Sequence, residues 1–275
     1  MANPVVVLIT GANSGVGYQT ALALFRSAKE TYQIYVGARS QDKATEAIKQ
    51  LQTENAVGGT QSDLISLVLD VADDHSISQA FDYVKESSGR LDVLINNAGI
   101  LIDHQGQSEG LTTRQIFSKS FDVNVTGAHI VTDTFAPLLV QSRDPKLLFL
   151  GTSMASLVIS QNPSLYFNQS PPSGWPKQSY KQDFWAYKST KLALMMIMRD
   201  WPKTLKNDGV KTWAINPGLV QTNLGNNPEL LKSINAGDPH VPALLIRDVI
   251  EGKSDEDVGK MIAPDGDYFG SLVPW

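Results

Sequence analysis

Short runs of apolar, often β-branched residues alternate with stretches of helical periodicity along almost the whole chain of 275 residues. Apolar residues three or four apart predict helices near 15–29, 41–54, 75–87, 112–141 (in two pieces) and 185–207. This order is typical of βαβ units, which build a parallel sheet covered by helices on both faces. Because no linker divides the chain, we predict one α/β domain over residues 1–275, with a doubly wound parallel sheet of seven strands. The predicted strands are Val5–Thr10, Gln33–Ala38, Leu64–Asp70, Val93–Asn96, Leu147–Gly151, Val210–Ile215 and Gly259–Ala263.

Composition and charge exclude several classes of protein. The chain has no cysteine, so it can form neither disulfides nor thiolate metal sites. Its four histidines show no ligand spacing, which argues against a metal enzyme. A net charge of −5 without basic clusters argues against nucleic-acid or anionic-membrane partners, and the longest apolar run, Leu192–Met198, is too short to cross a bilayer. We therefore expect a cytoplasmic protein without a metal.

A glycine-rich turn follows the first predicted strand and opens the first predicted helix. It reads Thr10-Gly-Ala-Asn-Ser-Gly-Val-Gly17. Glycines at such a turn let backbone N–H groups approach a pyrophosphate, whose charge is favoured at a helix N-terminus. The context therefore predicts a dinucleotide site, the alternative being a structural turn that binds no ligand. The candidate residues of the turn are Gly11, Asn13, Ser14, Gly15, Val16 and Gly17.

The end of the second predicted strand bears on cofactor choice. Proteins of this architecture that prefer NAD carry an acidic residue there, which binds the ribose 2′-hydroxyl. This chain has Arg39 instead. A guanidinium suits a 2′-phosphate, so we expect NADP(H) in preference to NAD(H). If Arg39 is only a solvated charge, neither cofactor is favoured.

Tyr187 is the one tyrosine followed by a lysine four residues later, Lys191. Residues i and i+4 share a helix face, so the ammonium can lie near the phenol. A cation about 4 Å away would lower a phenol pKa of about 10 by up to about three units, towards the pH where acid–base catalysis is efficient. The pair is thus a candidate proton donor, the alternative being a surface pair without function.

The motifs occur in the order of the short-chain dehydrogenase/reductase family, and the sequence resembles its compact, single-domain branch from Thr10 to about Ala263. This resemblance implies a Rossmann fold. The residues that carry it are the glycine turn, Asp70-Val71, Asn96-Asn97-Ala98-Gly99, Asn124 within Phe-Asp-Val-Asn-Val, Ser153, Tyr187-x-x-x-Lys191, and Asn216-Pro217-Gly218 with Thr222.

The resemblance implies a role for each matching residue. Tyr187 would be the general acid, Ser153 would hydrogen-bond the substrate carbonyl, Lys191 would lower the tyrosine pKa and bind the nicotinamide ribose, and Asn124 would help to hold a proton-relay water. Asp70 would contact the adenine, Asn97 would stabilise the pocket floor, and Thr222 with the Pro217-Gly218 turn would face the nicotinamide amide. The remaining expected cofactor contacts are Val71, Ala98, Gly99 and Val220.

Two segments interrupt the alternation of strands and helices. Residues 158–184 are rich in proline and aromatic residues, and they form an insertion between Ser153 and Tyr187 compared with compact family members. By resemblance to carbonyl reductases with insertions here, this insertion loop could line an apolar pocket and block tetramer formation, or it could form a satellite core. Residues 218–242 are predicted to be a substrate-binding loop. We expect a monomer or a small homo-oligomer.

The function that the resemblance implies is the NADPH-dependent reduction of a ketone or aldehyde on a bulky, fairly apolar small molecule. Three alternatives stay open. The same site could reduce an imine or an activated double bond, or oxidise an alcohol in the reverse reaction. The chain could also be a dinucleotide sensor without catalysis, although all four catalytic positions are filled.

Overall fold

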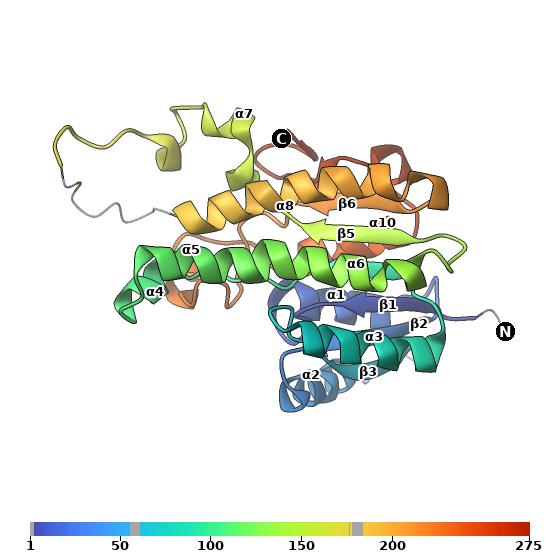
Figure 1. Cartoon of the computed structure of the whole chain (residues 1–275). Helices are drawn as coiled ribbons and strands as arrows, with labels where there is room; N and C mark the ends of the chain where they lie inside the picture. The colour runs from blue at the N-terminus through green and yellow to red at the C-terminus, as the bar shows by residue number, and fades with distance from the viewer. Residues whose placement is uncertain (1–2, 56–60, 176, 178–183) are drawn as a thin grey trace.

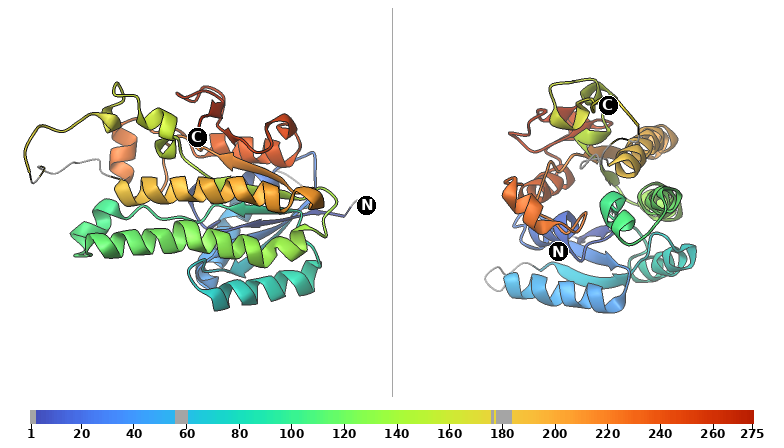
Figure 2. Two further views of the ribbon diagram at one scale, coloured as in Figure 1. Left: turned by 45° about the horizontal axis from the view of Figure 1, so that its top comes forward. Right: turned by 90° about the vertical axis from the view of Figure 1, so that its left-hand side faces the viewer.

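The fold is a three-layer sandwich with a twisted sheet between two layers of helices (Figures 1 and 2). The computed structural model describes residues 3–55, 61–175, 177 and 184–275. The strand order is β3-β2-β1-β4-β5-β6-β7-β8. The strands are β1 Val5–Ile9, β2 Tyr32–Ala38, β3 Asp63–Val68, β4 Val93–Asn96, β5 Lys146–Leu150, β6 Lys211–Ile215, β7 Met261–Ile262 and β8 Leu272–Val273.

The seven predicted strands form, and all of them are parallel. The structure adds β8, which pairs antiparallel with β7, so the sheet has eight strands rather than seven. A strand of two residues is too short to show a period of two in the sequence. The predicted parallel α/β fold in one domain is confirmed, and the edge strand is the correction.

Helices cover both faces of the sheet. The longer helices are α1 Gly15–Phe25, α2 Gln41–Glu54, α3 Asp74–Ser88, α5 Thr113–Phe121, α6 Ala128–Leu139, α8 Trp185–Thr204 and α10 His240–Ile250. Helices α1, α2 and α10 pack on one face, and α3, α6 and α8 pack on the other, as the end-on view of Figure 2 shows. Strand β1 explains why: Val7 and Ile9 face the first layer, whereas Val6 and Leu8 face the second.

Two parts of the structure differ from the prediction. Helix α10 was not predicted, because its first residues fall inside the predicted loop 218–242 and it contains Pro242. The predicted helical region 112–141 is α5 and α6 joined by one π-helical segment, Asp122–Gly127. A Cβ at Gly127 would lie within 2.2 Å of the Val71 carbonyl oxygen, so the helix meets the loop after β3 there at very short range.

Short elements occupy the connections. They are α4 Asp103–Ser108, α7 Leu157–Ser160, α9 Pro228–Ser233, and 3₁₀ turns at Ser153–Ala155, Tyr166–Asn168, Lys206–Asp208 and Asp255–Asp257. In the described residues no helix is long and apolar enough to cross a membrane.

The first part of the insertion loop is tied to the body of the protein. Ile159 and Leu165 are buried in the core cluster that α8 also contributes to, and Phe167 packs against that cluster. Trp175, by contrast, is 85% exposed. Residues 176 and 178–183, including Pro176 and Tyr180, lie outside the described residues. This arrangement supports the satellite-core interpretation for the first part of the loop.

Candidate active site

A cleft of about 840 Å³ lies at the carboxyl ends of the parallel strands, the edge where open α/β sheets bind ligands. Most of the predicted site residues line it: Gly11, Asn13, Ser14, Gly15, Val16, Arg39, Asp70, Val71, Asn97, Ala98, Gly99, Tyr187, Lys191, Pro217 and Thr222. The structure therefore brings together, on one surface, predicted residues from the glycine turn, from the ends of four further strands and from α8.

Five predicted residues do not line the cleft: Gly17, Asn124, Ser153, Gly218 and Val220. Gly17 lies behind the glycine turn, where a Cβ would come within 2.4 Å of the Asn97 amide nitrogen. Val220 instead forms an isolated parallel bridge with Gly237, which fixes the base of loop 218–242. The contact of Val220 with the cofactor stays a prediction.

The glycine turn is held open by its backbone conformation and by Asn97. Gly11 and Gly15 have φ angles of +63° and +59°, which side chains other than glycine rarely adopt. The Asn97 amide nitrogen donates to the carbonyl oxygens of Thr10 and Gly11 at 2.8 and 3.1 Å. A turn of this shape at the start of α1 suits an anionic diphosphate, so these residues fit a dinucleotide.

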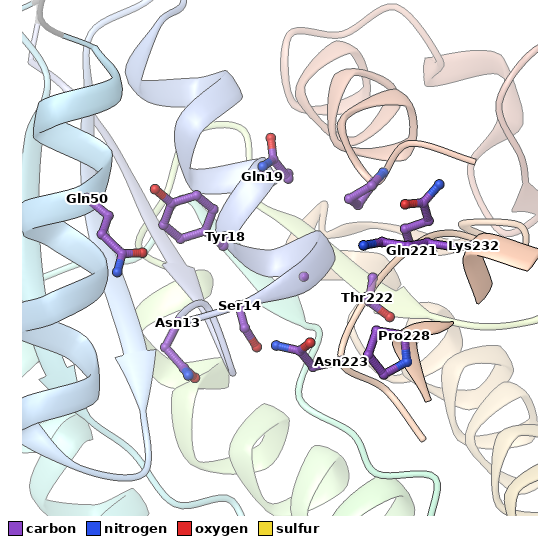
Figure 3. A pocket seen from close by; sticks show the side chains of 12 residues that line it. Asn13, Ser14, Tyr18, Gln19, Gln50, Gln221, Thr222, Asn223, Pro228 and Lys232 are labelled. Carbon is purple, nitrogen blue, oxygen red and sulfur yellow. The ribbon is translucent and has the colours of Figure 1, made fainter. Parts of the chain in front are cut away.

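A second hollow of about 440 Å³ continues from the cleft beside the glycine turn. Figure 3 shows Asn13 and Ser14 of the turn on one side, with Thr222 and Asn223 of loop 218–242 opposite them. These residues also line the cleft, so the hollow extends the same site. Loop 218–242 thus lies across from the glycine turn.

The end of β2 presents two cations to the cleft. Arg39 follows the strand, and Lys43, in the first turn of α2, lines the same wall. Lys43 was not among the predicted residues, although it follows Arg39 by four residues across the start of a helix. An anionic group on the ribose at this corner would meet both charges.

Asn124 lies in the π-helical segment and is completely buried. Its side-chain oxygen accepts a hydrogen bond from the Ile100 N–H at 2.7 Å. Its nitrogen donates to the Ile100 carbonyl at 2.9 Å and to the Thr190 hydroxyl at 3.0 Å. Asn124 therefore joins the loop after β4 to α8 from behind the cleft.

Lys191 extends from α8 to the end of β5. Its ammonium donates to the Leu150 carbonyl oxygen at 2.8 Å. A Cβ on Gly99 would lie 3.5 Å from this ammonium and 3.2 Å from the Asn124 side-chain oxygen, so glycine leaves the room they occupy. Burial lowers the pKa of Lys191 to about 8, because the charged form loses hydration.

Tyr187 is 7% exposed and lines the cleft one helical turn before Lys191. Burial and the neighbouring Asp103 carboxylate raise the pKa of its phenol above the ordinary value. The expectation that Lys191 lowers this pKa is therefore wrong for this structure. The physical reason is geometric: the ammonium binds the Leu150 carbonyl and lies 5.8 Å from the centre of the Tyr187 ring.

Ser153 follows β5 in a 3₁₀ turn and is 8% exposed. The neighbouring hydroxyls of Thr152 and Ser156 accept hydrogen bonds from the backbone N–H groups of Met154 and Ile159. The Ser153 hydroxyl, in contrast, has no partner within the described ranges. Of these three hydroxyls, that of Ser153 is therefore the one that accepts no hydrogen bond from the backbone of the described residues.

Asn216 fixes the turn that carries Ser153. Its side-chain oxygen accepts hydrogen bonds from the N–H groups of Ser153, at 3.1 Å, and Gly218, at 3.3 Å. The turn after β5 and the turn after β6 are thereby tied to one buried side chain. Across the described residues there is no group of three or more side chains suited to hold a metal ion.

Comparison with known proteins agrees with this architecture. Residues 5–167 match the family model for short chain dehydrogenases. The chain is 39% identical over 265 residues to the short-chain dehydrogenase/reductase tropE of Talaromyces stipitatus, covering 95% of this chain and 96% of the relative. It is 40% identical over 259 residues to the short-chain dehydrogenase/reductase eupG of a Phoma species, covering 91% of each.

A solved structure, the NADPH-bound carbonyl reductase from chicken fatty liver, superposes with a TM-score of 0.76 at 21% identity, covering 100% of both chains. That similarity shows the fold. Together with the relatives above, it shows that the chain belongs to the short-chain dehydrogenase/reductase family. It is an oxidoreductase of a family that uses a nicotinamide dinucleotide.

Proposed function

We propose that the protein is an NADPH-dependent reductase, which converts a ketone or aldehyde on a bulky, fairly apolar molecule to the alcohol. The observation that carries this proposal is the pairing of a buried phenol, Tyr187, with a buried ammonium, Lys191, on one wall of the cleft. A phenol whose pKa is raised stays protonated at neutral pH. It can therefore serve as the proton donor in a reduction.

When bound, the reduced nicotinamide supplies a hydride to the carbonyl carbon. The chain supplies the rest of the chemistry. The Tyr187 hydroxyl gives its proton to the carbonyl oxygen, the Ser153 hydroxyl donates a hydrogen bond to the same oxygen, and the Lys191 ammonium would hold the nicotinamide ribose. The tyrosinate then recovers a proton from solvent, and the alcohol leaves.

The preference for NADPH rests on Arg39 and Lys43 at the end of β2. Two cations and no acidic residue directly after the strand favour a 2′-phosphate over a free 2′-hydroxyl. The solved carbonyl reductase of the same fold carries NADPH, which agrees with this assignment. Asp70 and Val71, after β3, would flank the adenine.

The substrate class follows from the wall beyond Gly99. Ile100, Leu101, Ile102, Leu111 and Leu224 line this part of the cleft. A surface of five aliphatic side chains gains free energy by excluding water from an apolar ligand. The cleft thus favours a bulky apolar carbonyl compound over a small polar one.

The test of this assignment is Tyr187→Phe, which removes the hydroxyl and keeps the ring. We expect NADPH oxidation in the presence of a panel of quinones, aromatic ketones and bulky aldehydes to fall by about 10²-fold or more. NADPH binding, followed by its fluorescence, should change less than threefold. Turnover at the wild-type rate in this variant would contradict the role of Tyr187.

A reduction of imines or activated double bonds would use the same proton donor, so the panel includes cyclic imines and enones. A dinucleotide sensor would bind NADPH without consuming it in any of these assays. The Ser153 hydroxyl, which has no hydrogen-bond partner among the described residues, favours the catalytic alternatives.

A further inference from the structure

The backbone at Tyr187 needs an acceptor from elsewhere in the chain. Tyr187 is the third residue of α8, which begins at Trp185. The first N–H groups of a helix have no partner within it, and those of the second and third residues are usually capped by the side chain before the helix. That residue is Phe184, whose side chain has no acceptor. The turn that holds the proposed proton donor is therefore without a local cap.

Asp103, at the start of α4, supplies the missing cap across 83 residues of chain. One carboxylate oxygen accepts from the Ala186 N–H at 2.8 Å, and the other accepts from the Tyr187 N–H at 3.2 Å. The residue is only 4% exposed, so solvent does not compete for these bonds. A second contact joins the same two segments: the rings of His104 and Phe184 meet edge to face at 5.2 Å.

We propose that Asp103 is a positioning residue, which fixes the first turn of α8 and so aims the Tyr187 hydroxyl at the substrate carbonyl. This inference rests on the proposed function only for the identity of the proton donor. The cap itself also gains from the positive end of the α8 dipole, which favours a carboxylate at this position.

The charge of Asp103 also acts on the phenol. Apart from burial, the Asp103 carboxylate is the one cause that shifts the pKa of Tyr187, and it raises it. Two other lysines of this half of the sheet are far from the phenol. Lys146 and Lys211 are the first residues of β5 and β6, so they lie at the amino ends of the strands, away from the cleft, and both contact Asp144. Among the described residues, the charged or titratable side chains on α8 and on the elements packed against this part of it include Lys188 and Lys191 of α8, His104 of α4, Arg114 and Lys119 of α5, and Asp122 of the π-helical segment.

Two substitutions separate the two effects. Asp103→Asn keeps the shape and one acceptor oxygen but removes the charge, whereas Asp103→Ala removes both. In Asp103→Asn, the pH above which carbonyl reduction declines should move down, because the carboxylate no longer raises the pKa of the phenol. In Asp103→Ala, kcat should fall by about tenfold or more, with less than a threefold change in the KM for NADPH, because the donor is misplaced. Asp103→Asn should recover most of that loss.

Amide hydrogen exchange of residues 184–190 provides a readout that needs no turnover. Exchange there should accelerate at least tenfold in Asp103→Ala and less in Asp103→Asn. The control is Asp73→Asn, which removes a charged cap from α3 and should change neither the pH profile nor exchange in α8. If no carbonyl compound reacts but exchange follows this order, the cap stands and the proposed function fails. Wild-type exchange and a wild-type pH profile in both Asp103 variants would overturn the inference.

Discussion

A buried lysine makes Lys191 a source of pH-dependent stability. Its pKa of about 8 in the folded protein lies below the ordinary value of 10.5. Between these two values the unfolded chain binds more protons, so stability should rise with pH. The contribution is unfavourable below pH 8 and is relieved as the pH approaches 10.5.

We therefore predict that the wild type gains stability relative to Lys191→Met between pH 7.5 and pH 10.5. A shift of this size corresponds to roughly 2–3 kcal/mol. Urea unfolding of both proteins across this range measures the difference. Parallel pH dependences would show that Lys191 is not desolvated in the folded protein.

Cofactor choice is also decided by single residues. Arg39→Asp should lower the ratio of kcat/KM with NADPH to that with NADH by about 10- to 100-fold, since it replaces a charged hydrogen-bond donor by a repulsive carboxylate. Arg114→Asp, on the exposed side of α5, is the matched charge change and should leave the ratio unaltered. An unchanged ratio in Arg39→Asp would contradict NADP(H) preference.

At the scale of elements, the π-helical segment joins two parts of the site. It carries Asn124, and its last residue, Gly127, packs against the Val71 carbonyl beside Asp70. Any side chain at Gly127 must displace backbone rather than a flexible side chain. The π-helical segment and the loop after β3, which carries Asp70 and Val71, are thus held in one fixed arrangement.

Gly127→Ala should therefore destabilise the protein by about 2–4 kcal/mol through overpacking. Gly237→Ala is the control, because a Cβ there meets its nearest neighbour at an ordinary 3.6 Å. We expect less than about 0.5 kcal/mol for that variant. Thermal unfolding of both proteins provides the comparison, and equal stability would mean that the loop after β3 yields readily.

The elements also show which features a sequence can predict. Strands β1 to β6 were predictable because continuous apolar runs between helical periods have few other interpretations. The π-helical segment was not, because the sequence of 112–141 keeps its helical periodicity through it. Helix α10 was missed where proline and glycine suggested that a loop continued to residue 242.

The site divides in the same way. The glycine turn and the Tyr187–Lys191 pair follow from local spacing, Asn97 was expected from the family resemblance, and all of them line one cleft. Asp103 could not be found this way, since its partners lie 83 and 84 residues further along the chain. The raised pKa of Tyr187 depends on burial and on that distant carboxylate, and neither can be read from the spacing of tyrosine and lysine.

The two ends of the cleft differ in their chemistry. The end near β2 presents Arg39 and Lys43, whereas the wall beyond Gly99 is aliphatic. Loop 218–242 reaches this wall: a Cβ on Gly225 would lie 3.2 Å from the Leu101 side chain. The cofactor and an apolar substrate would thus share one cleft, with Tyr187 and Lys191 in its wall.

The most direct test of this account is the transfer of deuterium from NADPH labelled at the nicotinamide C4 to an apolar aromatic ketone, followed by mass spectrometry and NMR of the product. We predict an alcohol with one deuterium on the former carbonyl carbon. Tyr187→Phe should form little or none of this labelled alcohol. Product labelled at another carbon, or formation of the labelled alcohol at an equal rate in Tyr187→Phe, would contradict carbonyl reduction by this site.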